Sequence, residues 1–563
     1  MFTDNVSIVL SGEAGQGLKT IESLCMTLLQ KSGYNAFLAK EFMSRVRGGN
    51  NTTEIRVSSQ KVYAFSDKID ILIVLGPDAI DRVAKRLAPG TFILGEKAHI
   101  DAKYAELGCM ICPLEIEAGL KELGGTIYAN NLINGLLCKL FSAEQDVANA
   151  LISAQFKAKG EEVIAKNLSA FQKGMTMAEA LPIKISIAKD PLVLKQAALS
   201  GTDAIGIGAI AGGCNFIASY PMSPSTGVLT YLAQKGREYG IVVEQAEDEI
   251  AAINMSLGAW YTGARGMVTT SGGGFALMTE GVSLAGCLES PAVIHLAQRP
   301  GPATGLPTRT EQGDLNLALY AGHGDFPRVI YAPGTLQDGI LLTHKAFDVA
   351  DRFQVPVFLL TDQYYLDSVG ITDKMDLAKL PVEHHFIKTG PDYLRYKLTP
   401  SGLSPRGIPG NGDGLVCLDS DEHDESGRIT EDAEMRTAMV DKRLKKLAEY
   451  IDVEPEIIGS PNYTTLVVGW GSTYGPICEA LKLIGRDDIA FAYFKQVYPV
   501  PKIAQQLLAK AKTRILVENN ATGQFGNLLK METMSDFHKR ILKYNGMQFS
   551  VEELVEQIMG AIK

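Results

Sequence analysis

The sequence has few of the features that mark secreted, membrane-bound or polyanion-binding proteins. Eight cysteines among 563 residues are too few and too scattered for a disulfide framework, so we expect a reducing, cytoplasmic compartment. Lysine and arginine total 54 against 64 aspartates and glutamates, and the net charge of −10 offers no general attraction for nucleic acid or acidic membranes. We therefore expect no nucleic-acid partner and no membrane partner.

Signal-peptide and membrane-spanning patterns are missing as well. The opening residues MFTDNVSIVL have no basic stretch before the apolar run and no small-residue cleavage site, which predicts a first β-strand in place of a signal peptide. The run 204–222 carries no charge, but four glycines interrupt it and Tyr220-Pro221 lies near its end. This run predicts a buried helix and loop and no membrane span.

Glycine is abundant: the chain has 56, about one residue in ten, against a usual share of roughly 7%. This surplus predicts many tight turns between strands and helices. Apolar runs typical of buried strands alternate with helical patterns along most of the chain, which predicts an α/β fold with parallel sheets. The predicted strands are 6–10, 71–75, 91–94, 240–244, 266–270, 292–297, 328–332, 356–361, 466–472, 489–494 and 514–518.

The alternation predicts three α/β domains and one irregular segment. A polar helical stretch at about 160–180, closed by Pro182, ends the first domain at about residue 185. Between about 389 and 461 the alternation fails, and Gly, Pro and Asp are frequent before a charged helix near 441–450. The predicted segments are 1–185, 190–385, a connector or insert at 386–460, and 461–563.

The first domain contains a glycine-rich turn that suits a phosphate-bearing ligand. Gly12, Gly15 and Gly17 follow a predicted strand and precede a predicted helix, where backbone N–H groups can bind a phosphate. The spacing is the reverse of the dinucleotide fingerprint, and close packing with tight turning explains the glycines equally well. Arg45 and Arg47, in the segment SRVRGG, can meet a phosphate or lie in a solvated loop.

Two further patterns have structural explanations, and we expect no metal site in this chain. Cys109 and Cys112 form a lone CxxC without a second cysteine pair nearby, which favours buried structural thiols. The segment 419–434 contains eight carboxylates and His423, but it lacks the glycine that a calcium loop requires at Asp424. A solvated surface loop is the expected structure there.

The second domain has two sharper motifs. In YPMSPST, Ser223 lies between two prolines, a way to present a hydroxyl group at a defined position, although a turn with helix-capping residues is the plainer alternative. In EQAEDE at 244–249, carboxylates follow a strand and precede a helix. Negative charges are favourable at a helix N-terminus, and this effect explains Glu247 and Asp248 without a catalytic role. The same effect is a weaker explanation for any of these carboxylates that points into a cleft.

The order of these motifs resembles the α subunits of 2-oxoacid:ferredoxin oxidoreductases, in the form with a γ-type domain fused ahead of the α part. GEAGQG and SRVRGG are similar to the γ module, and YPMSPST is similar to the family motif YPITPSS. Ser223 stands where the family usually has threonine, so the methyl group that would narrow the pocket is missing. The EDEIAAI helix and the stretches 270–281 and 295–315 extend the resemblance over essentially the full length.

The resemblance implies a γ-type domain, a pyrimidine-binding domain of thiamine-diphosphate enzymes and a transketolase C-terminal-like domain, in that order. It also implies a carboxylic acid that hydrogen-bonds the cofactor's aminopyrimidine, and Glu249 is the candidate by position. Ser223 with Arg299 would bind the substrate carboxylate, and Arg309 would bind a further substrate charge. Further cofactor contacts are expected from Tyr220, Pro221, Gly273 and Phe275.

The implied reaction is oxidative decarboxylation of a 2-oxoacid with coenzyme A, giving acyl-CoA, carbon dioxide and reduced ferredoxin. SPRGIPG at 404–410 and the acidic segment after it are similar to the 2-oxoglutarate-type subgroup, with pyruvate or branched-chain specificity as the alternative. This chain lacks the motifs for Mg²⁺ with the diphosphate and for a [4Fe-4S] cluster, and the resemblance implies that both belong to a separate β subunit in an α2β2 complex. The rival interpretations are a nicotinamide-dependent dehydrogenase and a non-catalytic scaffold.

Overall fold

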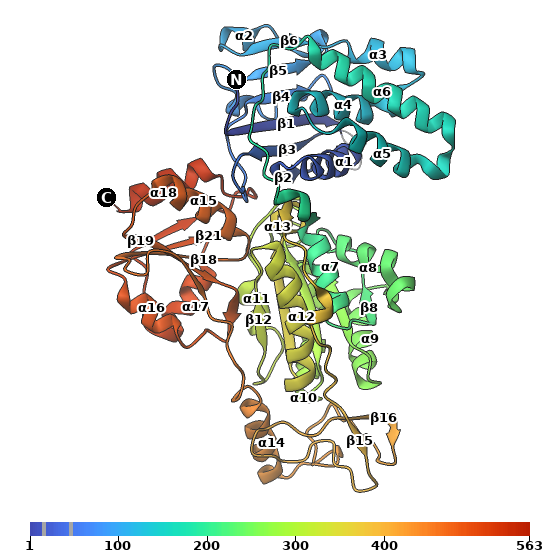
Figure 1. Cartoon of the computed structure of the whole chain (residues 1–563). Coiled ribbons are helices and arrows are strands. Elements are labelled where there is room, and N and C mark those ends of the chain that lie inside the picture. Colours follow the sequence, from blue (N-terminus) through green and yellow to red (C-terminus); the bar gives the residue numbers. More distant parts are fainter. Residues whose placement is uncertain (14–17, 44–48, 563) are drawn as a thin grey trace. The chain divides into compact units, whose positions relative to one another are not determined.

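The computed structural model describes residues 1–13, 18–43 and 49–562 (Figure 1). The chain divides into two compact units. Among the described residues, three sheets of five or more strands have helices packed on them, which confirms the predicted α/β class. One unit comprises Met1–Ser200, Asp367–Lys374 and Phe549–Val555, and the other comprises Gly201–Leu366, Met375–Gln548 and Glu556–Lys563. Among the described residues, none of the helices has the length and apolar composition needed to cross a bilayer.

The first unit contains an eight-stranded sheet that is only half parallel, in contrast to the parallel sheet that the sequence predicts. Strands β1, β4, β5 and β6 are parallel, whereas β3, β2, β14 and β7 continue the sheet in antiparallel pairs. Only residues 42–49 link β2 to β3, too few for the crossover that a parallel pair requires. The strands are β1 (Asn5–Glu13), β2 (Asn35–Glu41), β3 (Asn50–Ser58), β4 (Ile71–Val74), β5 (Phe92–Gly95), β6 (Met110–Pro113), β7 (Ala197–Ser200) and β14 (Val369–Thr372).

Two helices of the first unit pack closely because the residues at their contacts are glycines, which have no side chain. A Cβ on Gly135 of α4 (Ala129–Phe141) would overlap the backbone oxygen of Phe171, and one on Gly174 would overlap that of Leu132. Both contacts lie between α4 and α6 (Glu161–Glu179), the helix predicted at 160–180. The remaining longer helices are α1 (Leu18–Lys31), α3 (Ile116–Leu123) and α5 (Gln145–Phe156).

The second unit is built around a seven-stranded sheet in the order β20-β12-β13-β11-β10-β8-β9. Six strands are parallel, and β20 pairs antiparallel with β12 at the edge. The predicted strands from 240 to 361 are confirmed, but the uncharged run 204–222 contains α7 (Gly201–Ala211) and the unpredicted strand β8 (Phe216–Ser219). The other strands are β9 (Val242–Gln245), β10 (Gly266–Thr270), β11 (Ala292–Gln298), β12 (Val329–Tyr331), β13 (Pro356–Asp362) and β20 (Gln496–Tyr498).

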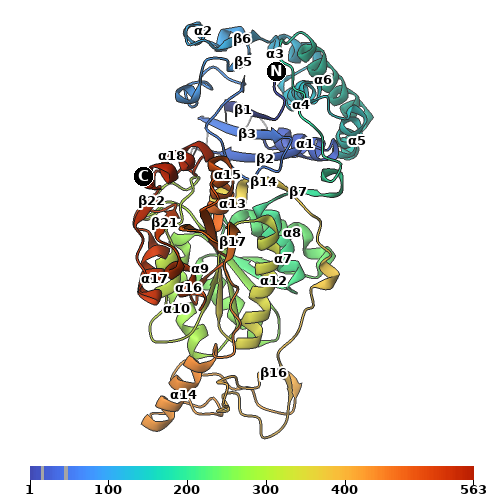
Figure 2. The same cartoon turned by 60° about the vertical axis from the view of Figure 1, so that its left-hand side comes forward.

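Alternate side chains of these strands point into two separate cores. Val268 and Ile294 face the core that contains α10 (Gly272–Cys287), whereas Met267 and Val293 face the core under α7, α8 (Thr226–Tyr239) and α12 (Leu336–Phe353). These four helices are labelled in Figure 2. Burial on both faces is why these strands are almost continuously apolar.

The last part of the second unit forms a five-stranded sheet in the order β17-β19-β18-β21-β22. Its side chains share one hydrophobic core with the α10 face of the seven-stranded sheet. The strands are β17 (Glu456–Gly459), β18 (Thr465–Trp470), β19 (Ile489–Phe494), β21 (Thr513–Glu518) and β22 (Lys539–Leu542), and the helices are α15 (Tyr474–Ile484), α16 (Ala504–Lys510), α17 (Gln524–Thr533) and, in part, α18 (Val551–Ile562). The four-segment division of the chain stays a prediction.

The segment between the two sheets is more ordered than a solvated loop. It contains β15 (Ile387–Thr389), β16 (Gly407–Gly412) and α14 (Ala433–Lys445), which begins earlier than the helix predicted near 441–450. His423 is 0% exposed and stacks on Tyr396 with ring centroids 3.8 Å apart. The expectation of a fully solvated acidic loop is therefore wrong for His423.

Buried ion pairs hold α14 in place. Both Lys442 and Lys446 bind the fully buried carboxylate of Glu289, at 2.6 and 2.7 Å. Burial alone would raise the pKa of Glu289, but Lys446 and Lys442 outweigh it and lower the pKa to about 2. A buried carboxylate stays ionised only when cations neutralise it, and here Lys442 and Lys446 do so. Because both lysines come from the end of α14, these ion pairs fix that helix against the end of α10.

Candidate functional site

The predicted site segments meet at the carboxyl ends of neighbouring parallel strands. Tyr220 follows β8, Glu249 follows β9, Ser271 follows β10 and Arg299 follows β11. These four strands are adjacent and parallel, so the segments after them emerge at one edge of the sheet. Ligands of α/β sheets bind at this edge.

Glu249 lies at the first position of α9 (Glu249–Tyr261), behind an aspartate that caps the helix. The Asp248 side chain accepts a hydrogen bond from the Ala251 N–H at 2.8 Å, the role expected of an acid at a helix N-terminus. Glu249 itself is turned inward and is only 3% exposed. Its Oε1 atom is buried without a hydrogen-bond partner among the described residues.

A glycine at the start of α10 makes room for this carboxyl group. A Cβ on Gly274 would overlap Glu249 Oε1 and Thr270 Oγ1. Burial raises the pKa of Glu249 and the neighbouring Asp248 raises it further, against the lowering effect of its own backbone N–H. A buried, protonatable oxygen that lacks a partner fits a hydrogen bond to a ring nitrogen of a bound cofactor.

Arg299 and Ser223 are brought together, as the sequence predicts. The Arg299 guanidinium donates from Nη1 to the backbone oxygen of Ser223 at 2.7 Å. Ser225, two residues further on, is fully buried and donates its hydroxyl to the Met222 backbone oxygen at 2.6 Å, so it serves the turn. Partial burial lowers the pKa of Arg299, which nevertheless stays a cation at neutral pH.

Arg309 belongs to the loop that follows Arg299 and packs against the segment after β22. Its Nη1 atom donates to Met547 Sδ at 3.5 Å, and the next residue's N–H donates to the Gly546 backbone oxygen at 3.2 Å. The position of Arg309 is therefore set by the C-terminal part of the chain. Its role toward a substrate stays a prediction.

Two acids in this loop were not among the residues that the sequence singled out. Asp314 lies beside Gly272 of α10, and burial raises its pKa to about 6 despite the opposing charge of Arg299. Burial and then Asp314 raise the pKa of Glu311 to about 7. The signal available was the motif TRTEQGDL, in which two carboxylates follow the candidate substrate arginine Arg309.

The other predicted cofactor contacts differ in exposure. Tyr220 is 41% exposed, Pro221 is half-buried and Gly273 is exposed, so all three are accessible at this edge. Phe275 is 0% exposed, and its ring lies edge-on to Phe358 with centroids 5.4 Å apart. Phe275 thus packs in the core of this unit, and a contact with a cofactor stays a prediction for all four.

The predicted phosphate site falls largely outside the described residues: Gly15, Gly17, Arg45 and Arg47 all lie there. Gly12 is described and is buried in β1, paired with Asn51 of β3. A cavity of about 400 Å³ lies at the ends of β4 and β5 in the same unit. It is lined by apolar side chains with Glu96, Glu117 and His99, a lining that does not favour a phosphate group.

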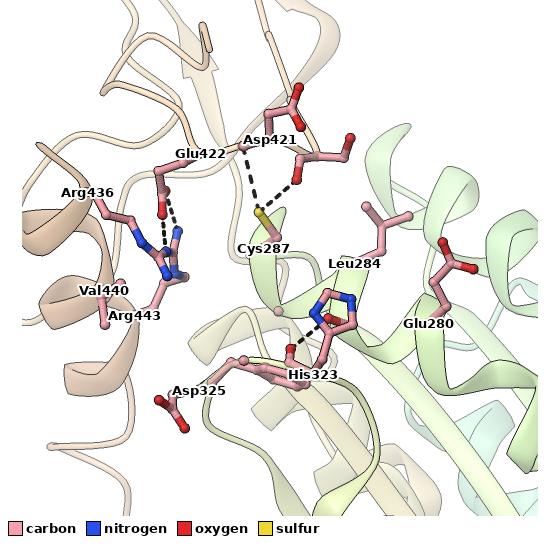
Figure 3. Close-up of a pocket in the computed structure, with 15 residues that line it drawn as sticks. Glu280, Leu284, Cys287, His323, Asp325, Asp421, Glu422, Arg436, Val440 and Arg443 are labelled. Carbon is pink, nitrogen blue, oxygen red and sulfur yellow. Dashed lines mark hydrogen bonds and ion pairs between the residues drawn. The ribbon is translucent and has the colours of Figure 1, made fainter. Parts of the chain in front are cut away.

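A larger cavity of about 590 Å³ lies at the other end of α10, between Cys287, the loop at His323 and the acidic segment (Figure 3). Charges of opposite sign neutralise each other on its wall. Arg443 holds both oxygens of Glu422 at 2.9 and 2.8 Å, and Arg436 also binds this carboxylate. Burial opposes the effect, but the two arginines lower the pKa of Glu422 to about 2.

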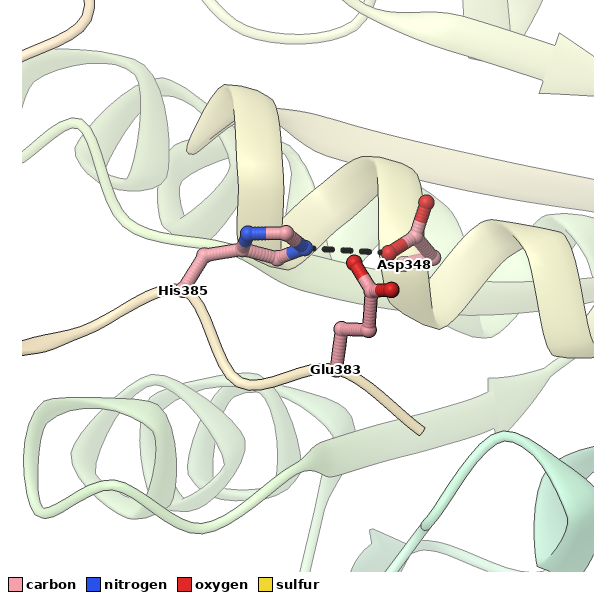
Figure 4. A group of neighbouring side chains, drawn as sticks. All are labelled: Asp348, Glu383 and His385. Atoms are coloured by element: carbon pink, nitrogen blue, oxygen red, sulfur yellow. Dashed lines mark hydrogen bonds and ion pairs between the residues drawn. The ribbon is translucent and has the colours of Figure 1, made fainter. Parts of the chain in front are cut away.

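One group of side chains has the composition of a metal site (Figure 4). Asp348, Glu383 and His385 offer ligand atoms within 4.8 Å of one another, and His385 Nε2 lies 3.0 Å from Asp348 Oδ1. The hydrogen bond from His385 lowers the pKa of Asp348, with Arg265 and Arg352 adding to the effect. The two arginines disfavour a metal ion, and the hydrogen bond between His385 and Asp348 anchors the segment after β14 to α12.

Comparisons with known proteins agree with this arrangement. The family described as "Pyruvate flavodoxin/ferredoxin oxidoreductase, thiamine diP-bdg" matches residues 207–442, and "Pyruvate ferredoxin/flavodoxin oxidoreductase" matches residues 7–177. The chain is 31% identical to a 2-oxoacid:ferredoxin oxidoreductase subunit alpha of a Sulfolobus species, over 99% of this chain and 97% of that protein. It is 32% identical to a 2-oxoglutarate synthase subunit KorA of Archaeoglobus fulgidus, over 65% of this chain and 99% of that protein.

A solved structure is similar over the whole chain. The 2-oxoglutarate:ferredoxin oxidoreductase from Magnetococcus marinus, with 2-oxoglutarate, coenzyme A and succinyl-CoA bound, is 30% identical and covers 100% of both chains with a TM-score of 0.91. Sequence and fold are therefore similar over essentially the full length, and the family matches cover residues 7–177 and 207–442. The chain belongs to the family of 2-oxoacid:ferredoxin oxidoreductase α subunits with a fused N-terminal γ-type domain.

Proposed function

We propose that this chain is the α subunit of an enzyme that oxidatively decarboxylates 2-oxoglutarate with coenzyme A, giving succinyl-CoA, carbon dioxide and reduced ferredoxin. The observation that carries the proposal is the buried Oε1 of Glu249 against Gly274, which has no hydrogen-bond partner in the described part of the chain and lies at the same strand edge as Arg299 and Ser223. The similarity to the 2-oxoglutarate enzyme of Magnetococcus marinus supports this substrate.

In this proposal, side chains of this subunit bind the substrate and hold a proton for the cofactor. Thiamine diphosphate, when bound, supplies the carbanion that attacks the 2-oxo carbon. Glu249 holds a proton at Oε1 and shares it with the cofactor's pyrimidine ring, a role that its raised pKa supports. Arg299 binds the substrate carboxylate together with Ser223, and Arg309 binds the distal carboxylate. Tyr220, Pro221, Gly273 and Phe275 stay candidates for further cofactor contacts.

The proposal includes a β subunit that completes the site. Large apolar side chains lie exposed on the two helices that begin at the site, namely Ile250 and Met255 of α9 and Leu277 of α10. Exposed apolar side chains around a site are typical of a surface that a partner protein covers. We propose that the β subunit contributes Mg²⁺ and the [4Fe-4S] cluster in a cytoplasmic α2β2 complex, and that the γ-type domain contributes to coenzyme A binding through Gly12, Gly15, Gly17, Arg45 and Arg47.

Substrate choice provides the first test. Arg309→Ala should raise the KM for 2-oxoglutarate by about 10-fold or more and leave the KM for pyruvate within about 3-fold, because only the dicarboxylate has a second charge to lose. The measurement is a panel of 2-oxoacids with coenzyme A and a low-potential acceptor, run with the complex. Equal effects on both substrates would show that Arg309 does not bind the distal carboxylate. Turnover of pyruvate alone by the unchanged enzyme would contradict the proposed substrate.

The division of the site between subunits provides the second test. The chain purified alone should bind thiamine diphosphate weakly and show no iron–sulfur absorbance, because all eight cysteines are free thiols without clustered spacing. The cofactor's diphosphate also needs Mg²⁺ with oxygen ligands, which we assign to the partner. Calorimetry with Mg²⁺ and cofactor, with and without the β subunit, measures the difference. Micromolar binding by the isolated chain would refute the proposed division.

A further inference from the structure

Asp314 occupies an unusual position for a residue that precedes a helix. Its backbone stands at the N-cap of α11 (Leu315–Tyr320), but its side chain makes no capping hydrogen bond. The carboxyl group lies beside Gly272 of α10 instead, where a Cβ on the glycine would be 2.5 Å from both carboxyl oxygens. The Oδ2 atom is buried without a hydrogen-bond partner among the described residues. No hydrogen bond to the buried Oδ2 atom therefore explains why the carboxyl group is held at this position among the described residues.

The backbone of Asp314 is tied to the strand that presents Arg299. The Asp314 N–H donates to Gln298 Oε1 at 3.0 Å, and Gln298 is the last residue of β11. Gln298 is fully buried, and its Nε2 donates to the Thr361 backbone oxygen at 3.2 Å. This fixed side chain ties the backbone of Asp314 to the residue that precedes Arg299. The geometry does not bring them into an ion pair in the described part of the chain, and they interact through space.

Few other charges face Asp314. Glu311 from the same loop is the one carboxyl group whose pKa Asp314 raises, and Arg299 is the one cation that lowers the pKa of Asp314 among the described residues. The C-terminal segment adjoins this loop with neutral amides. Gln524 Nε2 donates to the Gly313 backbone oxygen at 2.8 Å, and Asn520 Nδ2 donates to the Gln312 backbone oxygen at 3.1 Å.

We propose that Asp314 is a positioning residue that takes up a proton when the 2-oxoacid carboxylate binds to Arg299. The proposal rests on the role of Arg299 in the proposed function. Without substrate, the guanidinium is the charge that stabilises the ionised form of Asp314. When a substrate carboxylate binds the same guanidinium, Asp314 loses that stabilisation and faces a second anion in a site of low polarity. The proton comes from the buffer and forms an O–H bond on the Asp314 carboxyl group. The step involves no oxidation or reduction.

The direction of the pH dependence follows from linkage. The pKa of Asp314 is about 6 without substrate, and the substrate anion raises it further. Between these two values, binding consumes a proton, so affinity for the 2-oxoacid falls by up to about 10-fold for each unit that the pH rises. Below both values Asp314 is already protonated, and affinity does not depend on this group.

The test uses the α–β complex with thiamine diphosphate and N-oxalylglycine, a 2-oxoglutarate analogue whose amide carbonyl resists attack. Calorimetric titration in two buffers of different ionisation enthalpy measures the protons taken up. We expect more than about half a proton per site at pH 7.5 in the unchanged complex. Asp314→Asn should abolish this uptake and bind the analogue more tightly at pH 8, because the amide is neutral like the protonated acid. Glu311→Gln is the matched control and should retain the uptake.

Absence of uptake in the unchanged complex would overturn the proposal, as would full uptake in Asp314→Asn or its loss in Glu311→Gln alone. The first of these measurements needs no variant, so a failure of Asp314→Asn to assemble leaves the proposal open to refutation. Arg299→Lys separates the two levels of inference. If this variant binds the analogue normally, the proposed function of Arg299 fails; if binding is weak but the unchanged complex takes up no proton, only the role of Asp314 fails.

Discussion

Replacing Glu249 by glutamine should lower turnover about 10²- to 10⁴-fold while the complex still assembles. Glutamine keeps the shape of the side chain and fills the space beside Gly274, but its amide cannot exchange a proton with the cofactor ring. The loss is therefore expected in the rate and not in protein stability. The direct measurement is hydrogen–deuterium exchange at C2 of the bound thiazolium, which should slow in parallel with turnover.

Asp248→Asn is the matched control for this prediction. Asp248 is the neighbouring acid and caps α9 through the Ala251 N–H, and asparagine caps a helix about as well as aspartate. Turnover of this variant should stay within a few-fold of the unchanged enzyme. If Glu249→Gln retained C2 exchange at the original rate, the assignment of Glu249 would be wrong. Equal losses in both variants would instead indicate a structural effect on the start of α9.

Replacing Arg299 by lysine should raise the KM for every 2-oxoacid by about 10- to 100-fold, with a smaller change in kcat. An ammonium group cannot bind the Ser223 backbone oxygen and a substrate carboxylate with the spread geometry of a guanidinium. The effect is common to all substrates because all share the carboxylate next to the 2-oxo group. Initial rates with pyruvate and 2-oxoglutarate over a range of concentrations measure it.

Arg237→Lys, at the exposed end of α8, provides a control for the loss of a guanidinium elsewhere in the same unit. It should leave both Michaelis constants unchanged. An Arg299→Lys enzyme with a normal KM would remove Arg299 from substrate binding. A selective effect on 2-oxoglutarate would assign Arg299 to the distal carboxylate, the role proposed for Arg309.

The fold was predictable where the pattern of a segment was long and regular. Strands β10, β11 and β13 are buried on both faces, so their apolar runs stand out from the turns around them. Strand β8 was missed because it shares one uncharged run with α7, and periodicity cannot divide such a run. Strands β7 and β14 are short. They join the first sheet through the pairing of Val369 in β14 with Leu38 in β2, residues that are far apart in the sequence.

The site was predictable to the extent that its residues lie in contiguous motifs. Glu249, Ser223 and Arg299 each stand in a recognisable segment, and the structure brings Arg299 and Ser223 into contact. Asp314 and Glu311 lie in the same stretch as Arg299, but the sequence pattern does not show that they are buried. Burial raises the pKa of both acids, and for Asp314 it comes from packing beside Gly272 of α10, which is a property of the packed chain.

By itself, the sequence determined the α/β class, the order of the motifs and the family, because these depend on local patterns and on residue identities. Only the tertiary structure decided that four neighbouring strands end at one edge and that Glu249 is buried away from solvent. It also decided that Gly274 leaves room for the carboxyl group of Glu249. It also decided that His423 is buried and that Asp314 lies beside Gly272. The burial of a side chain, its pKa and the hydrogen bonds of its oxygens depend on which distant segments pack together. No single stretch of the chain contains this information.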